Sequence, residues 1–340
     1  MTTAAVVGLG DISALHLAAI DRLAGIKLVG VCDVDEARAE AAAQRWGVPG
    51  FTDHRALLAA VRPDVVHVTT PHHQHVPVAL DALGAGGHVL TEKPLAHTVA
   101  SAEELVAAAE ASESMVGVVW QNRYNPTSVA IRRALDEGLI GDVIGARAAV
   151  WWSRSAAYYE ASPWRGRWDQ AGGGVLINQA IHTLDLLLWF LGEPVGVGGS
   201  ASTVSLREAI EVEDAATIVL THTGGARSTL FATNCHHAND PVELEITGRL
   251  GALRLDQGRV LVTTASGVRE LANDARADGV RSYWGLGHEL LIADFHAHVA
   301  SGKRFWLDAA SGLPALRVLR EVYRQSGLLD EPAGDPAALG

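Results

Sequence analysis

Cysteine is scarce in this chain, with only Cys32 and Cys235 among 340 residues. Two cysteines exclude a disulfide framework and a cysteine zinc site. No run of Lys and Arg exceeds two residues and the formal net charge is −12, which argues against nucleic acid and anionic membranes as partners. The longest apolar stretch, around Leu184–Leu191, is too short to span a bilayer. Because the N-terminus lacks the basic segment of a signal peptide, we expect a cytoplasmic protein.

Length and patterning predict an α/β protein of two domains. Residues 1–121 alternate short β-rich runs with Ala- and Leu-rich helical stretches, which predicts a doubly wound parallel sheet of the Rossmann type. Residues 122–340 instead contain consecutive β-rich runs, and Gly224-Gly225 is typical of a hairpin turn. We therefore predict a C-terminal α+β domain with an open, mostly antiparallel sheet. Such a sheet needs its second face covered, which favours a homodimer or homotetramer formed through it.

The first β-rich run ends in a dinucleotide-binding pattern, Gly8-Leu9-Gly10-Asp11-Ile12-Ser13. Gly8 allows the tight turn, and Gly10 lets the backbone approach a pyrophosphate at a helix N-terminus. The third position must only be small, so Ser13 is a mild departure. Asp33 follows the second run, about 20 residues after the glycines, where a carboxylate can bind the adenosine ribose. Asp33 could also cap the helix that follows.

The charge of Asp33 bears on which nucleotide binds. A ribose phosphate there would meet a like charge, and the next basic residue, Arg38, is five positions further on. The sequence therefore favours NAD over NADP.

One polar stripe interrupts an apolar segment between Gly172 and Gly192. Read as a helix, the segment places Asn178, His182 and Asp185 on one face. A helix that is apolar nearly all round is buried, and buried polar groups need hydrogen bonds. The stripe therefore either satisfies itself internally, with a His–Asp pair locking the helix to its neighbour, or lines a cleft.

Two further segments carry candidate site residues. Pro94 keeps Lys93 out of helical geometry, so the ammonium lies at the carboxyl end of the fifth β-rich run. The long loop 153–171 is rich in aromatic and arginine side chains, which stack on sugars and bind carboxylates or phosphates; it could equally be a surface loop held by its aromatics. Its arginines raise an acidic or nucleotide-linked sugar as substrate. These loop residues are Tyr158, Tyr159, Trp164, Arg165, Arg167 and Trp168.

These motifs occur in order along nearly the whole chain, and together they resemble the Gfo/Idh/MocA oxidoreductase family. The segments that carry the resemblance are Gly8-Leu9-Gly10, Cys32-Asp33, Thr70-Pro71-His72-His73-Gln74-His75, Glu92-Lys93-Pro94, Gly172-Gly173-Gly174 with His182-Thr183-Leu184-Asp185, and Gly287-His288 with Asp294-Phe295. Family members often have Asp where this chain has Asn178, and an amide cannot accept a proton, so we expect Asn178 to orient its neighbours. His72 replaces a usual Asn.

The resemblance implies an NAD-dependent enzyme that oxidises a secondary alcohol, or reduces a ketone, of a sugar, sugar derivative or cyclitol. It assigns Lys93 to polarising the reacting oxygen and His182 to acid–base transfer, which suits imidazole near neutral pH. The catalytic set is Lys93, His182 and Asn178. Cofactor contacts are expected from Gly8, Gly10, Asp11, Ile12, Asp33, Thr70, Pro71, His72, His75, Glu92, Lys93, Gln121, Trp164 and Arg165. Substrate contacts are expected from Lys93, Arg123, Tyr158, Arg165, Asn178, His182 and Asp185.

Two other functions compete with a dehydrogenase. A hydrolase or lyase could retain NAD and oxidise its substrate only transiently, and a regulator could bind NAD without catalysis. A metal site is not expected, since His296 and His298 are two residues apart and would face away from each other on a helix.

Overall fold

The computed structural model describes residues 1–274 and 287–329 of the chain. These residues form two compact units, one of residues 1–121 and 287–313, the other of residues 122–274 and 314–329. The sequence analysis predicts a domain boundary after residue 121. Residues 287–313 of the first unit lie within the sequence range 122–340 that is predicted as the second domain. Of that predicted domain, residues 275–286 and 330–340 lie outside the described residues.

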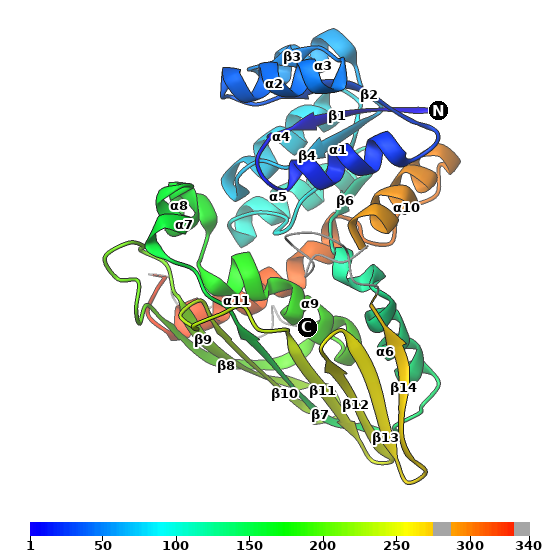
Figure 1. Ribbon diagram of the computed structural model, residues 1–340, viewed down its shortest axis with the longest axis vertical. Coiled ribbons are helices and arrows are strands. Elements are labelled where there is room, and N and C mark those ends of the chain that lie inside the picture. The colour runs from blue at the N-terminus through cyan, green and yellow to red at the C-terminus, as the bar shows by residue number, and fades with distance from the viewer. Residues whose placement is uncertain (275–286, 330–340) are drawn as a thin grey trace. The chain divides into compact units, whose positions relative to one another are not determined.

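The first unit contains a parallel sheet of six strands in the order β3-β2-β1-β4-β5-β6 (Figure 1). This confirms the predicted doubly wound fold. Strand β4 is buried at all four positions, as expected where helices cover both faces of a parallel sheet. Its elements are β1 Thr2–Val7, α1 Ser13–Arg22, β2 Ile26–Cys32, α2 Glu36–Trp46, β3 Gly50–Phe51, α3 His54–Val61, β4 Val65–Val68, α4 His72–Gly84, β5 His88–Thr91, α5 Val99–Glu110, β6 Val116–Val118, α10 Gly287–Ser301 and η5 Ala309–Gly312.

Helix α10 belongs to this unit because its Phe295 side chain fills the space beside Gly117 of strand β6. A Cβ on Gly117 would lie 2.7 Å from the Phe295 ring and 3.0 Å from the Phe305 ring, and both rings are fully buried. Helix α10 also packs beside α1, far away in sequence (Figure 1). The order of elements along the sequence does not indicate that the chain returns to the first unit at α10.

The second unit contains an eight-stranded sheet in the order β14-β13-β12-β11-β7-β10-β9-β8. Among its strand pairs only β7 and β10 run parallel, which confirms the mostly antiparallel prediction. Its elements are η1 Gln121–Tyr124 at the boundary, α6 Pro126–Asp136, β7 Val143–Trp151, α7 Ala156–Glu160, η2 Pro163–Gly166, α8 Trp168–Ala171, η3 Leu176–Ala180, α9 Ile181–Leu191, β8 Pro194–Ser202, β9 Ala215–His222, β10 Arg227–Thr233, β11 Glu243–Gly248, β12 Gly251–Asp256, β13 Arg259–Thr264, β14 Gly267–Asn273 and α11 Leu313–Gln325.

One face of this sheet is buried under helices. Strand β9 alternates strictly, with Ala216, Ile218 and Leu220 buried between more exposed neighbours. Helices α6 and α9 contact the sheet, and Val322 of α11 packs at Gly199 of β8. The stretch Trp168–Leu191 is long and apolar enough by composition to cross a membrane, but 78% of its most apolar window is buried inside the protein, as in a core helix.

Candidate functional site

The predicted cofactor residues of the first unit follow the carboxyl ends of parallel strands. Gly8 comes directly after β1 and has a φ of 92°, a conformation that favours glycine. A Cβ there would lie 2.7 Å from the backbone of Thr69 and of Thr70, which follow β4. Glycine at position 8 therefore lets two neighbouring strand ends meet closely. Ligands bind at this edge in open α/β sheets.

Gly10 and Thr70 leave room and hydrogen-bonding capacity at the same edge. A Cβ on Gly10 would meet nothing within 4 Å, so the backbone there is open to a close ligand. Ser13 begins α1, and its hydroxyl donates to the Gly10 carbonyl over 2.6 Å. The Thr70 hydroxyl is buried without a hydrogen-bond partner among the residues that the structure describes. An open glycine turn, a helix start and an unsatisfied hydroxyl fit a bound dinucleotide phosphate.

Asp33 ties the glycine turn to the end of β2. Its two carboxylate oxygens accept from the backbone N–H groups of Leu9 at 2.7 Å and Asp35 at 2.9 Å. The helix-capping role considered for Asp33 belongs instead to Asp35, which accepts from Ala37 and Arg38 at the start of α2. The Arg38 guanidinium lies 3.4 Å from Asp35. The ribose-binding role of Asp33 stays a prediction.

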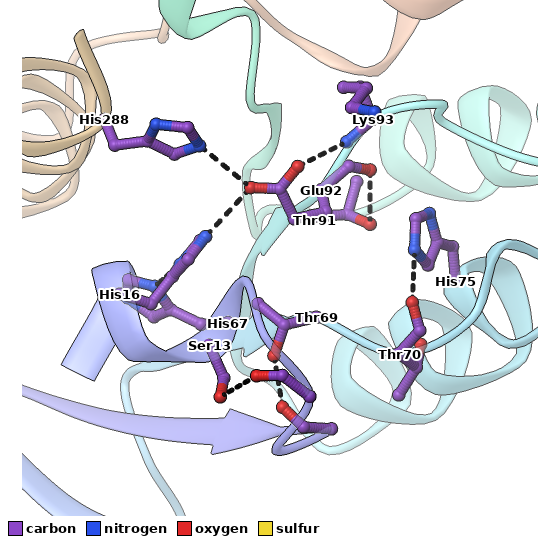
Figure 2. A network of polar contacts seen from close by, with 12 residues as sticks. Ser13, His16, His67, Thr69, Thr70, His75, Thr91, Glu92, Lys93 and His288 are labelled. Carbon is purple, nitrogen blue, oxygen red and sulfur yellow. Dashed lines mark hydrogen bonds and ion pairs between the residues drawn. The ribbon is translucent and has the colours of Figure 1, made fainter. Parts of the chain in front are cut away.

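Lys93 follows β5, next to a buried carboxylate. Glu92 is buried, whereas Lys93 is partly exposed, and the Lys93–Pro94 peptide bond is cis. The backbone N–H of Lys93 donates to Glu92 Oε2 over 3.2 Å (Figure 2). The His75 ring lies between two carbonyls, with Nδ1 2.7 Å from that of Pro94 and Nε2 2.9 Å from that of Thr70. His75 thus holds the segment after β4 against the segment that carries Lys93.

The other predicted cofactor residues differ in exposure. Asp11 is exposed and Ile12 half-buried in the glycine turn. Pro71 caps α4, where His72 is buried, and Gln121 is buried shortly after β6. Trp164 and Arg165 belong to the second unit.

The polar stripe of the second unit is the partly exposed part of a buried helix. Asn178 and His182 are half-buried, whereas nearly all their neighbours in the segment are buried. Residues Leu176–Ala180 form a π-helical turn rather than an α-helical one. Because a π turn holds more residues than an α turn, the α-helical spacing that the sequence predicts between Asn178 and His182 does not hold here. Turns of this kind are frequent at functional sites.

Asp185, the third residue of the stripe, is engaged by Arg123. The guanidinium donates to both carboxylate oxygens, at 2.9 and 2.7 Å, and both side chains are largely buried. Burial raises the pKa of Asp185, and the Arg123 guanidinium opposes that rise. The two predicted substrate residues therefore bind each other and link η1 to α9.

The loop 153–171 folds around aromatic and arginine side chains. The Arg165 guanidinium lies over the rings of Tyr158, at 4.9 Å, and Trp164, at 5.1 Å. Arg154 also stacks on Tyr158, at 5.2 Å. The Tyr158 hydroxyl accepts from Gln179 Nε2 over 3.4 Å, which connects the loop to the stripe segment.

Glu213 holds the start of the stripe segment, and the sequence analysis misses it. This buried carboxylate accepts from the backbone N–H groups of Gly174, at 2.7 Å, and Leu176, at 3.0 Å. Tyr323 donates to it over 2.9 Å. A Cβ on Gly174 would lie 1.8 Å from the Glu213 carbonyl, which explains the glycines before the segment. The sequence feature that could have pointed to Glu213 is a pair of acidic residues, Glu213 and Asp214, directly before a β-rich run.

The histidines do not gather as metal ligands. Among the described residues no group of three or more His, Cys, Asp or Glu side chains could hold a metal ion. Several histidines instead join a buried hydrogen-bond network around Glu92, which includes His16 of α1 and His67 of β4 (Figure 2). The signal for it was a histidine within the otherwise apolar run Val65–Val68.

Together, a doubly wound sheet, a glycine turn open to a ligand and an acid after the second strand define a dinucleotide-binding protein. Sequence profiles agree with this class: residues 2–119 match the oxidoreductase family with an NAD-binding Rossmann fold, and residues 128–254 match the GFO/IDH/MocA C-terminal domain. The chain therefore belongs to the Gfo/Idh/MocA oxidoreductase family, with NAD as its cofactor.

Curated relatives of the chain are sugar and cyclitol dehydrogenases. A D-apiose dehydrogenase of Paraburkholderia graminis is 31% identical over 74% of this chain and 66% of its own length. An inositol 2-dehydrogenase of Rubrobacter xylanophilus is 29% identical over 89% of this chain and 81% of its own. Among solved structures, the WlbA dehydrogenase of Bordetella pertussis, in complex with NADH and UDP-GlcNAcA, is 28% identical with a TM-score of 0.83, and 96% of each chain is covered.

Proposed function

We propose that this protein transfers a hydride between NAD(H) and a secondary alcohol or ketone of a sugar, sugar derivative or cyclitol. Membership of the family and the relatives named as apiose and inositol dehydrogenases support the class of substrate. The observation that carries the proposal is the half-exposure of Asn178 and His182 on an otherwise buried helix. Polar groups are kept on a core helix where they serve a ligand.

Three side chains have distinct roles in this proposal. His182 takes the hydroxyl proton during oxidation and returns it during reduction, because imidazole titrates near neutral pH. The Lys93 ammonium hydrogen-bonds the reacting oxygen and stabilises negative charge that develops there. Asn178 cannot take up a proton, so it orients the imidazole or the substrate.

The cofactor, when bound, supplies the hydride acceptor or donor. Gly8 and Gly10 would hold its pyrophosphate at the start of α1, and Asp33 would accept from the adenosine ribose. Both oxygens of Asp33 already accept backbone N–H groups, and each retains a further lone pair for a hydroxyl. A carboxylate in this position favours NAD over NADP.

A panel of polyols and sugars with NAD and NADP, followed by absorbance of the reduced nicotinamide, tests the function. We expect turnover of at least one cyclitol or sugar with NAD. His182→Ala should lower that turnover by roughly 10²–10⁴-fold with NAD affinity unchanged. His237→Ala, an exposed histidine in the same unit, is the matched control and should not change turnover. Unchanged turnover in His182→Ala would assign this residue to packing.

The same assay separates the two competing functions. A hydrolase or lyase that retains NAD would consume a glycoside without net change in the reduced nicotinamide. A regulator would bind NAD and turn over no polyol, aldose or ketose.

A second substrate class is favoured by the loop 153–171. The guanidinium groups of Arg154 and Arg165 both lie against the Tyr158 ring, and paired arginines bind carboxylates and phosphates. The WlbA relative is in complex with an acidic nucleotide sugar. UDP-linked uronic acids therefore belong in the panel beside neutral sugars.

Assembly and compartment are also proposals. We infer a homodimer or homotetramer formed through the face of the large sheet that carries Trp151 and Phe231, whose rings lie 4.5 Å apart and are partly exposed. The free thiols of Cys32 and Cys235 are compatible with a reducing cytoplasm.

A further inference from the structure

A continuous line of hydrogen-bonded side chains crosses the first unit. Starting at Glu92, it runs through the three imidazoles of His16, His67 and His296 and ends at the hydroxyl of Thr2. The contacts are Glu92 Oε1 to His16 Nε2 at 3.1 Å, His16 Nδ1 to His67 Nδ1 at 2.8 Å, His67 Nε2 to His296 Nε2 at 3.0 Å, and His296 Nδ1 to Thr2 Oγ1 at 2.9 Å. Each ring thus uses both of its nitrogens.

The two ends of this line lie at opposite edges of the parallel sheet. Glu92 directly follows β5, at the carboxyl edge where the cofactor residues lie, whereas Thr2 is the first residue of β1. Strand β4, which carries His67, lies between β1 and β5. Glu92 and the three histidines of the line are buried, and Thr2 is partly exposed. The line therefore connects solvent at one edge with Glu92, the residue before Lys93, at the other.

The charge of Glu92 determines which nitrogens of the three rings carry hydrogens. Burial raises the pKa of Glu92, but hydrogen bonds from His16 and from His288, whose Nε2 lies 3.4 Å away, outweigh burial and hold that pKa well below its usual range (Figure 2). Burial holds the pKa of His67 well below 6.5 and lowers that of His296 to about 4. Near neutral pH the rings of His67 and His296 are therefore neutral, and each carries one N–H.

An ionised carboxylate only accepts hydrogen bonds, so His16 donates to Glu92, and with a single N–H on each of the three rings the pattern is fixed from the Glu92 end. His16 carries its hydrogen on Nε2 and donates to Glu92. His67 then carries its hydrogen on Nδ1, and His296 on Nε2. The Thr2 hydroxyl donates to His296 Nδ1. Every hydrogen in the line points toward Glu92.

We propose that Thr2, His296, His67, His16 and Glu92 form a proton relay between solvent and the cofactor edge of the sheet. In one passage Thr2 gives its hydroxyl proton to His296 Nδ1 and regains one from water. His296 passes its Nε2 proton to His67 Nε2, His67 its Nδ1 proton to His16 Nδ1, and His16 its Nε2 proton to Glu92. One proton has then entered, Glu92 is neutral and each ring is again neutral with its hydrogen on the other nitrogen.

The use of this proton rests on the proposed function. Reduction of a ketone to an alcohol consumes one proton besides the hydride, and oxidation releases one. The resting pattern conducts inward, so it brings one proton from solvent to Glu92, the residue before Lys93, when reduction consumes a proton at the cofactor edge. Once the rings have exchanged their tautomers, the line conducts outward from neutral Glu92 and serves oxidation.

The first test reads the hydrogens directly and needs no turnover. In protein labelled with ¹⁵N-histidine, long-range ¹H–¹⁵N spectra at neutral pH should show His16 and His296 with hydrogen on Nε2 and His67 with hydrogen on Nδ1. A charged His16, His67 or His296, or hydrogen on His67 Nε2, would overturn the relay whether or not the enzyme has a substrate.

The second test measures proton uptake with a pH-indicator dye while NADH and the ketone of a substrate found in the panel react. His67→Gln retains a side chain that can bridge its neighbours but cannot shuttle protons, so uptake should slow about tenfold or more. His222→Gln is the matched control, since His222 is a buried bridging histidine of the second unit, bonded to Gly192 and Ser228. At the outer end, Thr2→Val should slow uptake and Thr2→Ser should not. Normal uptake in both His67→Gln and Thr2→Val refutes the relay, whereas no NADH oxidation by the wild type refutes the proposed function.

Discussion

Asp33 and Asp35 have the same side chain two positions apart and bind different parts of the structure. Asp33 accepts from the glycine turn through Leu9, whereas Asp35 accepts from Ala37 and Arg38 at the first turn of α2. The first carboxylate therefore holds the glycine turn, where we propose that the cofactor binds, and the second caps a helix. From sequence alone either acid could cap the helix, because the choice depends on the backbone path after β2.

Replacing each acid separately tests this division. Asp33→Ala should weaken NAD binding about tenfold to a hundredfold, since it removes hydrogen bonds from a charged acceptor. Asp35→Ala should lower the free energy of unfolding by about 1 kcal/mol, the typical value of a helix cap, with NAD affinity unchanged. Calorimetric titration with NAD and urea unfolding measure the two effects. Equal NAD affinity in both variants would contradict the role of Asp33.

At the scale of single residues, the sequence indicates which residues are site candidates better than it indicates which side chains contact one another. Lys93 and Asn178 are placed by short motifs, and the structure leaves both side chains partly exposed, as a site requires. The pairing of Arg123 with Asp185 was not predictable, because it joins residues 62 positions apart. The same holds for His16 and His67, which meet only once α1 packs on the sheet.

At the scale of elements, the start of the stripe segment depends on a buried acid. Glu213 binds the N–H groups of Gly174 and Leu176, where a helix N-terminus favours negative charge. Burial nevertheless raises the pKa of Glu213 from 4.5 to about 7, although those backbone donors lower it. This carboxylate therefore titrates within the range in which the enzyme would work.

The raised pKa predicts how stability changes with pH. Between pH 4.5 and about 7 the folded protein holds a proton that unfolded Glu213 has lost, so this contribution is complete below pH 4.5 and disappears as pH rises through 7. The loss amounts to about 3 kcal/mol. Glu213→Gln should remove it, so that the difference in unfolding free energy between pH 5 and pH 8 shrinks by a similar amount. An unchanged difference in urea titrations would show that Glu213 does not titrate in this range.

Most elements are predictable from hydrophobic periodicity, and the exceptions have physical reasons. Strand β9 occupies Ala215–His222, as its alternation predicts. Strand β3 has only two residues, too few for a period, and β14 is mostly exposed, so neither has a core-facing pattern. The π turn in η3 is invisible to a period of 3.6 residues, although it contains Asn178.

At the scale of the whole molecule, the large sheet offers a face for self-association. Strand β10 buries Ser228, Leu230 and Ala232 and leaves Thr229 and Phe231 on the opposite side. On that side the Phe231 ring contacts the ring of Trp151 on the neighbouring strand β7. An aromatic pair on an incompletely covered face indicates an interaction surface.

A charge on this face should dissociate the proposed oligomer. We expect the wild type to have the mass of a dimer or tetramer by light scattering, and Phe231→Asp to reduce it, because a carboxylate in an apolar interface is strongly destabilising. Val34→Asp, at a position 91% exposed in the first unit, controls for added charge. A monomeric wild type, or a Phe231→Asp variant of unchanged mass, would exclude this interface.

The return of α10 to the first unit has a consequence for dissecting the protein. Residues 1–121 alone would lack Phe295 and Phe305, which fill the space beside Gly117, and also His288 and His296. A fragment that ends at residue 121 would expose the apolar surface that Phe295 and Phe305 cover. It would also have an incomplete hydrogen-bond network around Glu92. An autonomous nucleotide-binding fragment would thus require residues 287–313 to be spliced onto its end, and gene shuffling at residue 121 would not transfer a working module.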